Sequence, residues 1–324
     1  MRLRLHRRSF LAGAAVLASG AWARPSLAAA PLDVVATIAQ IGEAVERIGG
    51  ERVTARALMG EGVDPHTYRQ TRSDIAALSR ADAIFWNGLY LEAQLAKLLG
   101  DMAGRKPVVA VAEALPPDRL LQSPDFPGKY DPHVWMDPAL WSLAVAAVRD
   151  GLVAADPDGE SLYRANAEAY LAEIAAVEAY ARTVLATVPE DRRIVISSHD
   201  AFGYFGRAFG FEVIGIQGLS TESEAGLGQI ERLVNLLVER QVPAVFVESS
   251  VSERNVRALV EGAAARGHEV KVGGQLFSDA MGAPGTYTGT YVGMLDSNVT
   301  VITRALGGDA PARGLHGRLD GAAS

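Results

Sequence analysis

The sequence predicts an α/β protein made of two doubly wound, (βα)4-type lobes with parallel sheets, joined by one long rigid helix. Short apolar runs alternate with helical patterns in residues 31–157 and again in residues 190–307, which predicts the two lobes. Residues 158–189 between them carry one continuous helical pattern. The chain has 324 residues, of which 49% are hydrophobic, so it is long enough to bury two separate cores.

The first predicted lobe alternates strands and helices, as a parallel sheet with helices on its faces requires. The expected strands are Val34–Thr37, Val53–Leu58, Ala83–Asn87 and Val108–Val111. The expected helices are Ile38–Ile48, Arg72–Ser79, Leu91–Leu99 and Ala139–Asp150. Gly49-Gly50 and Gly100 end two of these helices, and Pro138 precedes the last one.

The second predicted lobe repeats this pattern. Its expected strands are Ile194–Ser197, Glu212–Ile216, Ala244–Glu248 and Glu269–Val272. Its expected helices are Ala201–Phe209, Ser223–Glu239, Glu253–Arg266 and Tyr291–Leu306. Thr221 and Glu224 have the spacing of a capping box at the start of the second of these helices. Residues 308–324 are rich in Gly, Ala and charge, and are expected to form a flexible tail.

The helix expected between the lobes contains neither Gly nor Pro from Glu160 to Val188. Its apolar residues recur at three- and four-residue steps and form one stripe, made of Tyr163, Ala167, Tyr170, Ile174, Val177, Ala181, Val184 and Val188. A helix of about 29 residues is roughly 43 Å long, which is enough to reach both lobes. A continuous helix resists the large swings that a flexible linker allows.

Residues 1–30 carry the pattern of an export signal. The paired arginines Arg7-Arg8 precede Ser9-Phe10-Leu11, an apolar stretch continues to Ala18, and small residues end the segment. This order predicts a cleaved twin-arginine signal that engages the export machinery, and therefore a periplasmic mature protein. The apolar stretch is too short to span a membrane, so the mature chain is expected to be soluble.

The composition excludes several kinds of site and partner. The chain has no cysteine, so no lipid anchor is expected, and any metal site must use nitrogen and oxygen ligands. The formal charge is -7, and the five arginines of residues 1–30 leave with the signal, which disfavours nucleic acid as a partner. The motifs of P-loop ATPases, α/β-hydrolases and His-Glu-x-x-His metalloproteases are absent from the sequence.

The tripeptide Asp-Pro-His occurs twice, ending at His66 and at His133. His66 follows the second expected strand, and His133 precedes the helix that begins near Pro138. In the second lobe, His199 comes directly after a strand, and Asp279 lies just past the last strand. Because ligands gather at the carboxyl ends of parallel strands, these four side chains are expected to meet between the lobes. Three imidazoles and one carboxylate suit a divalent ion such as Zn²⁺ or Mn²⁺.

Simpler interpretations of the same residues stay open. A single histidine in a loop also fits a hydrogen-bonded surface residue, and Asp279 alone also fits a helix N-cap. His268 is interpreted as structural and His316 as solvated. Three aspartates next to candidate ligands are expected to orient imidazoles, although an aspartate before proline also forms turns: they are Asp64, Asp131 and Asp200.

Five segments carry a resemblance to a known family: Leu58–His66, Trp86–Glu92, Tyr130–Asp137, Ser198–Phe205 and Phe277–Gly282. In this order they resemble the zinc/manganese-binding receptors of bacterial ABC importers, the cluster A-I or TroA-like family. The resemblance covers the chain from about Val34 to Gly307. It implies two α/β lobes joined by a long helix, and a membrane permease as partner. It also implies one metal between the lobes, with ligand roles for His66, His133, His199 and Asp279.

The resemblance leaves the metal open between zinc and manganese. Many manganese-preferring relatives have a carboxylate where His199 stands, and nitrogen-rich ligation favours Zn²⁺. Many zinc receptors, however, carry a His-rich loop before the second ligand, whereas Pro116–Lys129 is short and has no histidine.

The expected function is that of a monomeric periplasmic receptor, not an enzyme, that captures one Zn²⁺, or alternatively Mn²⁺, for an ABC permease. One rival hypothesis is a zinc-dependent hydrolase in which Asp279 or Glu248 acts as general base. A second rival is a receptor for a chelated metal or another small solute. Neutral imidazoles bind metal, so the affinity is expected to fall as the pH drops through the histidine range near 6.5.

Overall fold

A four-stranded parallel sheet forms the centre of the N-terminal lobe, with strand order β2-β1-β3-β4. We describe a computed structural model of residues 30–124 and 126–320. The strands are β1 (Leu32–Ile38), β2 (Val53–Met59), β3 (Ala83–Trp86) and β4 (Val108–Ala110). The helices of this lobe are α1 (Ala39–Gly49), α2 (Arg72–Arg80), α3 (Ala96–Ala103) and α4 (Pro138–Ala155). The predicted export signal, except for Ala30, lies outside the described residues.

Helix α3 begins later than the sequence predicts. The expected start at Leu91 is wrong because residues 91–95 form turns, in which the Leu95 backbone N–H donates to the Glu92 carbonyl three residues earlier. The residues just before them, Gly88, Leu89 and Tyr90, are left-handed, with φ angles of 80°, 52° and 72°, so a right-handed helix cannot extend back through them. The carboxylate of Glu92 holds this turn, since it accepts hydrogen bonds from the backbone N–H groups of Asn87 and Gly88.

The C-terminal lobe contains two parallel strand pairs, in which β5 (Ile194–Ser197) pairs with β6 (Glu212–Gly215), and β7 (Ala244–Glu248) pairs with β8 (Lys271–Leu276). Strand β5 lies next to β7. The last strand starts at Lys271 instead of the expected Glu269. The helices of this lobe are α6 (Gly203–Phe209), α7 (Leu227–Glu239), α8 (Arg254–Ala264) and α9 (Tyr291–Ala305).

The predicted capping box at Thr221 and Glu224 is wrong. Helix α7 begins only at Leu227, and its N-cap residue, Gly226, has no side chain with which to cap it. The hydroxyl of Thr221 instead donates a hydrogen bond to Asp64 of the other lobe. A long-range partner therefore takes the side chain that the local pattern assigned to the helix terminus.

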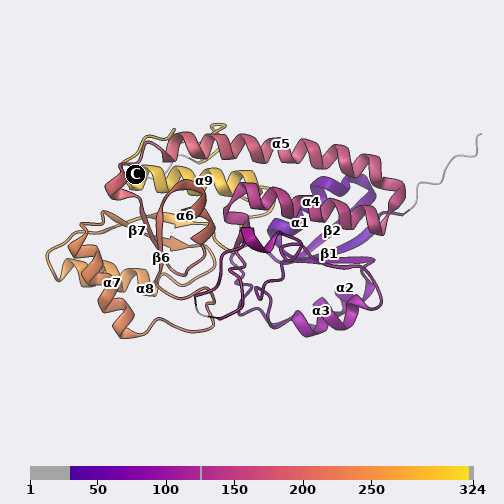
Figure 1. The fold of residues 1–324 in the computed structure, drawn as a ribbon, viewed down its shortest axis with the longest axis horizontal. Helices are drawn as coiled ribbons and strands as arrows, with labels where there is room; N and C mark the ends of the chain where they lie inside the picture. The colour runs from indigo at the N-terminus through magenta and orange to yellow at the C-terminus, as the bar shows by residue number, and fades with distance from the viewer. Residues whose placement is uncertain (1–29, 125, 321–324) are drawn as a thin grey trace, which may run out of the picture. The chain divides into compact units, whose positions relative to one another are not determined.

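The long helix α5 (Glu160–Leu185) packs against α1 and α4 of the N-terminal lobe and against α9 of the C-terminal lobe (Figure 1). Its buried residues are those of the predicted apolar stripe within its bounds, with Leu185 in addition. Helix α4 beneath it is apolar and long enough to cross a membrane by length and composition alone, but it packs against α1 and α5 in the core. The predicted long helix between two α/β lobes is therefore present.

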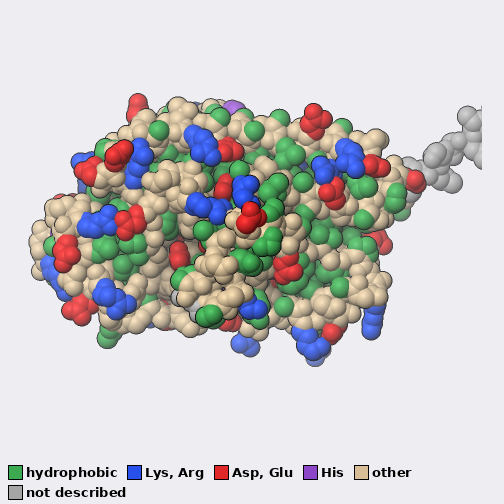
Figure 2. All heavy atoms as spheres, in the orientation of Figure 1, with side chains coloured by type: hydrophobic (Ala, Val, Ile, Leu, Met, Phe, Trp, Pro, Cys, Tyr) green, Lys and Arg blue, Asp and Glu red, His purple; other side chains and the backbone are tan. Residues whose placement is uncertain are grey.

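The segment after α9 differs from the predicted flexible tail. Ala310 and Leu319 are buried, and the Leu315 backbone N–H donates to the Asp296 carboxylate at 3.0 Å. The burial of these apolar side chains and the bond to Asp296 hold residues 308–320 against the C-terminal lobe. Residues 321–324 lie outside the described part of the chain. On the face shown in Figure 2, acidic and basic side chains are intermixed.

Candidate metal centre

The first Asp-Pro-His copy lies in the loop that follows β2. The Oδ1 atom of Asp64 accepts a hydrogen bond from the His66 backbone N–H at 2.9 Å, which closes a tight turn around Pro65. His66 is 4% exposed. His66 therefore lies buried in the loop that leaves the carboxyl end of β2.

The second copy lies just before a 3₁₀ turn, Val134–Met136, that leads into α4. Here one oxygen, Asp131 Oδ1, accepts hydrogen bonds from the His133 backbone N–H at 2.9 Å and from the His133 ring Nδ1–H at 2.7 Å. The Tyr204 hydroxyl donates to the Asp131 carbonyl at 2.8 Å, and the Asn87 amide donates to the Pro132 carbonyl at 3.0 Å. These bonds fix the ring of His133 so that its Nε2 atom faces the site, which is the orienting role predicted for Asp131.

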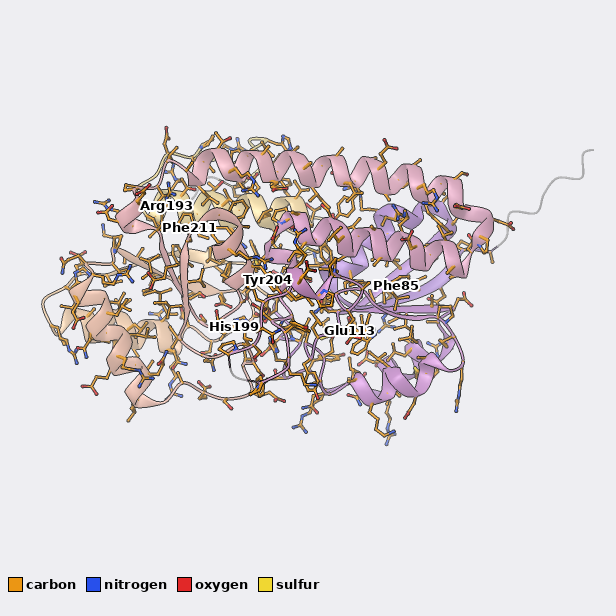
Figure 3. All side chains as sticks on the ribbon, viewed as in Figure 1. Phe85, Glu113, Arg193, His199, Tyr204 and Phe211 are labelled. Carbon is orange, nitrogen blue, oxygen red and sulfur yellow. The ribbon has the colours of Figure 1, made fainter. Side chains whose placement is uncertain are left out.

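His199 lies two residues after the end of β5, and its orienting partner is Glu248, the last residue of β7. Glu248 Oε1 accepts from the His199 backbone N–H at 2.8 Å, and Glu248 Oε2 accepts from the ring Nδ1–H at 2.5 Å. The sequence assigned this role to Asp200, so the orienting residue predicted for His199 is corrected to Glu248. Figure 3 shows His199 and Tyr204 in the region between the strands of the two lobes.

Asp279 follows β8, and residues of the other lobe hold its backbone. The Gln40 amide donates to the Asp279 carbonyl at 3.0 Å, and the Trp135 indole N–H donates to the Ser278 carbonyl at 2.9 Å. Neither contact is predictable from a local pattern, because each partner is separated from Asp279 by more than a hundred residues.

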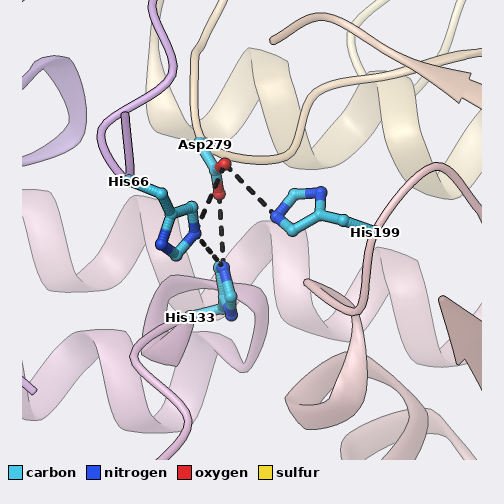
Figure 4. Close-up of side chains that lie close together, drawn as sticks. All are labelled: His66, His133, His199 and Asp279. Atoms are coloured by element: carbon cyan, nitrogen blue, oxygen red, sulfur yellow. Dashed lines mark hydrogen bonds and ion pairs between the residues drawn. The ribbon is translucent and has the colours of Figure 1, made fainter. Parts of the chain in front are cut away.

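The four predicted residues meet at one point (Figure 4). Each offers a ligand atom, and these four atoms lie within 4.8 Å of one another. The His199 and His133 Nε2 atoms lie 3.3 Å and 3.4 Å from oxygens of Asp279. The His66 Nε2 atom lies 3.8 Å from Asp279 Oδ2 and 3.3 Å from His133 Nε2. All four residues are buried.

The carboxylates and histidine rings of this group shift one another's pKa values. Burial lowers the pKa of His133, but the nearby Asp131 and Asp279 carboxylates outweigh it and raise the pKa to about 9. Burial alone would raise the pKa of Asp279, but His199 and His133 hold it well below its usual range. Burial lowers the pKa of His66 to about 3, with Asp279 opposing the shift and the other two histidines adding to it.

Buried polar atoms at this point lack hydrogen-bond partners. Within the described residues, these include both carboxylate oxygens of Asp279 and the Nε2 atom of His199. A buried polar group without a partner is costly, and a cation among the four donors would satisfy them together. The arrangement is suited to bind a divalent ion through nitrogen and oxygen atoms.

His268 and His316 do not belong to this group. His268 makes a hydrogen bond with the Val242 carbonyl at 2.9 Å, which fits its predicted structural role. Glu248 was missed as an orienting residue, although one signal for it existed: a carboxylate at the end of an otherwise apolar strand, Ala244–Glu248.

Comparison with known proteins identifies the family. Residues 34–305 match the family described as zinc-uptake complex component A, periplasmic (ZnuA). The chain belongs to this family. The predicted resemblance is therefore confirmed over nearly the whole range in which the five sequence segments occur.

Individual proteins resemble the chain along most of its length. It is 45% identical to the manganese-binding lipoprotein MntA of Bacillus subtilis (strain 168) over 276 residues, covering 85% of this chain and 90% of that protein. It is 43% identical to the zinc-binding protein TroA of Treponema pallidum (strain Nichols) over 273 residues, covering 84% and 88%. The solved structure of periplasmic zinc-binding TroA from Treponema pallidum matches with a TM-score of 0.83 and 43% identity, covering 85% of this chain and 99% of that chain. The predicted two-lobe α/β fold is confirmed.

Proposed function

We propose that this protein is the metal-binding receptor of an ABC importer, which captures one divalent cation between its lobes and delivers it to a membrane permease. The ligands in this proposal are the Nε2 atoms of His66, His133 and His199 and the carboxylate of Asp279. The cation is the transported substrate. Membership of the zinc-uptake family supports the assignment to transport.

The spacing of the four donors is the observation that carries the proposal. A tetrahedral ion with metal–nitrogen distances of about 2.0–2.1 Å separates its ligand atoms by roughly 3.3 Å. Three of the donor separations here are 3.3, 3.3 and 3.4 Å, and a fourth is 3.8 Å. Three of the six separations therefore match a small divalent ion, the His66 nitrogen lies slightly far from the carboxylate, and all four donors lie within 4.8 Å of one another.

The same geometry favours a receptor over a hydrolase. A catalytic zinc ion keeps one position open for water, whereas four protein ligands close a tetrahedral shell. Glu248, a candidate general base in the hydrolase hypothesis, uses both carboxylate oxygens to hold His199. Asp279, the other candidate base, is itself one of the four donors.

The proposed cargo is Zn²⁺, with Mn²⁺ as the alternative. Three imidazole nitrogens favour Zn²⁺, and the affinity order of divalent metals places it above Mn²⁺. The similar proteins named above include one called zinc-binding and one called manganese-binding. Titration of the metal-free protein with both ions in competition tests this choice, and preferential binding of Mn²⁺ at equal concentrations would reverse it.

Elemental analysis of the purified protein tests the site itself. We expect about one metal ion per chain, and the His66→Ala and Asp279→Ala variants should each lose most of it, because each removes one of four ligands. His268→Ala is the matched control, since His268 lies outside the group and bonds to Val242. Unchanged metal content in both ligand variants would contradict the site, and wild-type protein that binds no metal would contradict the function.

We further propose that residues 1–30 direct export, and that the receptor works in the periplasm as lobes 31–157 and 190–307 joined by linker 158–189. The MntA relative is named a lipoprotein, whereas this sequence contains no cysteine. We therefore propose a mature form without a lipid on cysteine. Cell fractionation tests this, and recovery of the protein in the membrane fraction would contradict it.

A further inference from the structure

The two Asp-Pro-His copies use their aspartates differently. In the second copy, Asp131 holds both the backbone N–H and the ring of His133. In the first copy, Asp64 holds the backbone N–H of His66 at 2.9 Å through Oδ1. The other oxygen, Asp64 Oδ2, accepts a hydrogen bond from the Thr221 hydroxyl at 2.5 Å. The first aspartate therefore links two lobes, while the second orients a ring.

Thr221 belongs to the loop of the C-terminal lobe between β6 and α7. The Gln217 amide braces this loop by donating to the Ser223 carbonyl at 3.2 Å. The next residue, Glu222, makes a second contact to the N-terminal lobe by accepting a hydrogen bond from the Gln94 amide at 2.9 Å. Gln94 and Glu222 are exposed, whereas Thr221 and Asp64 are half-buried. The bond between Asp64 and Thr221 is thus the better protected of these two lobe-to-lobe contacts.

The ring of His66 is held less firmly than the other two rings. In the described part of the chain, no hydrogen bond holds its Nδ1 atom, whereas carboxylates hold the Nδ1 atoms of His133 and His199. His66 also lines a surface cavity of about 390 Å³, together with Leu219 of the Thr221 loop. The position of this ring therefore depends on the backbone of its own loop, which Asp64 anchors.

We propose that Thr221 is a positioning residue for His66, acting through Asp64, and that it sets how long a bound metal ion stays in the site. This inference rests on the proposed metal-binding function. A metal leaves a four-ligand site by losing one ligand first, and the ligand with the least support is the one to leave. The Thr221 hydroxyl ties the His66 loop to the opposite lobe and so opposes that step.

The test measures the rate of zinc release after rapid mixing with excess fluorescent chelator. Thr221→Val keeps the side-chain shape but removes the hydroxyl, and loss of this half-buried hydrogen bond, with the net strength of an ordinary one, should accelerate release about five- to tenfold. Thr221→Ser restores the hydroxyl and should restore the wild-type rate. Thr67→Val is the matched control, because the Thr67 hydroxyl also donates to Asp64 Oδ2, at 3.1 Å, but from within the same loop.

Release from Thr221→Val at the wild-type rate would overturn the inference while leaving the metal site intact. Equal acceleration in Thr67→Val would also overturn it, because the effect would then not depend on a bond between lobes. Thermal unfolding of each metal-free variant separates a loss of folding from a loss of positioning. If the wild-type protein bound no zinc at all, the proposed function would fail first and this inference with it.

Discussion

Replacement of Glu248 by glutamine should weaken metal binding more than its small chemical change suggests. The two oxygens of Glu248 accept separate hydrogen bonds, one from the His199 backbone N–H and one from the ring Nδ1–H. Both side chains are 0% exposed, so water cannot replace either acceptor. Glutamine has one acceptor oxygen and one NH₂ group, which is a donor. One of the two bonds must therefore become a contact between two donors.

The less costly way to relieve this contact between two donors removes a ligand atom from the proposed site. If the NH₂ group faces the ring, Nδ1 must become an acceptor, and the proton of neutral His199 then moves to Nε2. That Nε2 atom lies 3.3 Å from Asp279 and is the proposed metal ligand. A protonated nitrogen cannot bind a metal. Loss of such an orienting partner typically lowers metal affinity about 10- to 100-fold, or roughly 1.4–2.8 kcal/mol.

Asp131→Asn is the matched control, because Asp131 uses a single oxygen for both of its bonds to His133. Asparagine keeps that oxygen, so no donor is forced against another, and the loss should stay below about tenfold. Competition with a chelator of known zinc affinity measures both variants. Equal losses in the two variants, or an unchanged affinity in Glu248→Gln, would refute the reasoning from tautomers.

Two further predictions concern the contacts between α9 and the N-terminal lobe. Burial raises the pKa of Glu43 from 4.5 to about 7, although hydrogen bonds from the Tyr291 backbone N–H and the Tyr170 hydroxyl oppose the shift. The protonated Glu43 side chain therefore contributes stability that is fully present below pH 4.5 and is lost as the pH rises through 7. Glutamine does not titrate, so the free energy of unfolding of Glu43→Gln relative to wild type should rise by up to about 3 kcal/mol between pH 4.5 and pH 8. Denaturant unfolding of the metal-free proteins measures this, and a pH-independent difference would contradict it. Tyr291→Phe leaves the buried Trp135 carbonyl without the hydroxyl that donates to it at 2.9 Å, and should lower the free energy of unfolding by about 1–3 kcal/mol. An unchanged free energy of unfolding would show that this bond contributes nothing.

The sequence predicts the elements of the core better than their ends. Strands β5 and β7 begin and end where expected, because short apolar runs between polar segments identify buried parallel strands. The start of α3 was wrong because residues 91–95 form turns around the buried Glu92, whose burial is not visible in a local pattern. The start of α7 was wrong because Thr221 bonds to a residue 157 positions away.

The same distinction holds at the candidate site. The four donors were predictable because the repeated Asp-Pro-His and the strand ends mark loops that a parallel sheet brings together. Their supports were less predictable, since Glu248 and Gln40 reach the site from other elements. Asp131 was predicted correctly because its partner is only two residues away, which is within the reach of a local rule.

The supports of the four donors suggest how one site can both hold and release an ion. Carboxylates fix the rings of His133 and His199, and the opposite lobe holds the backbone of Asp279. His66 is the exception, since within residues 30–124 and 126–320 no carboxylate holds its Nδ1 atom, and its loop depends on a bond between the lobes. In the proposed site, three firmly held ligands would give affinity and selectivity, because their geometry is set before the metal arrives. The fourth proposed ligand gives a path for release, because loss of the bond between Asp64 and Thr221 would free the His66 loop while carboxylates still hold the rings of His133 and His199.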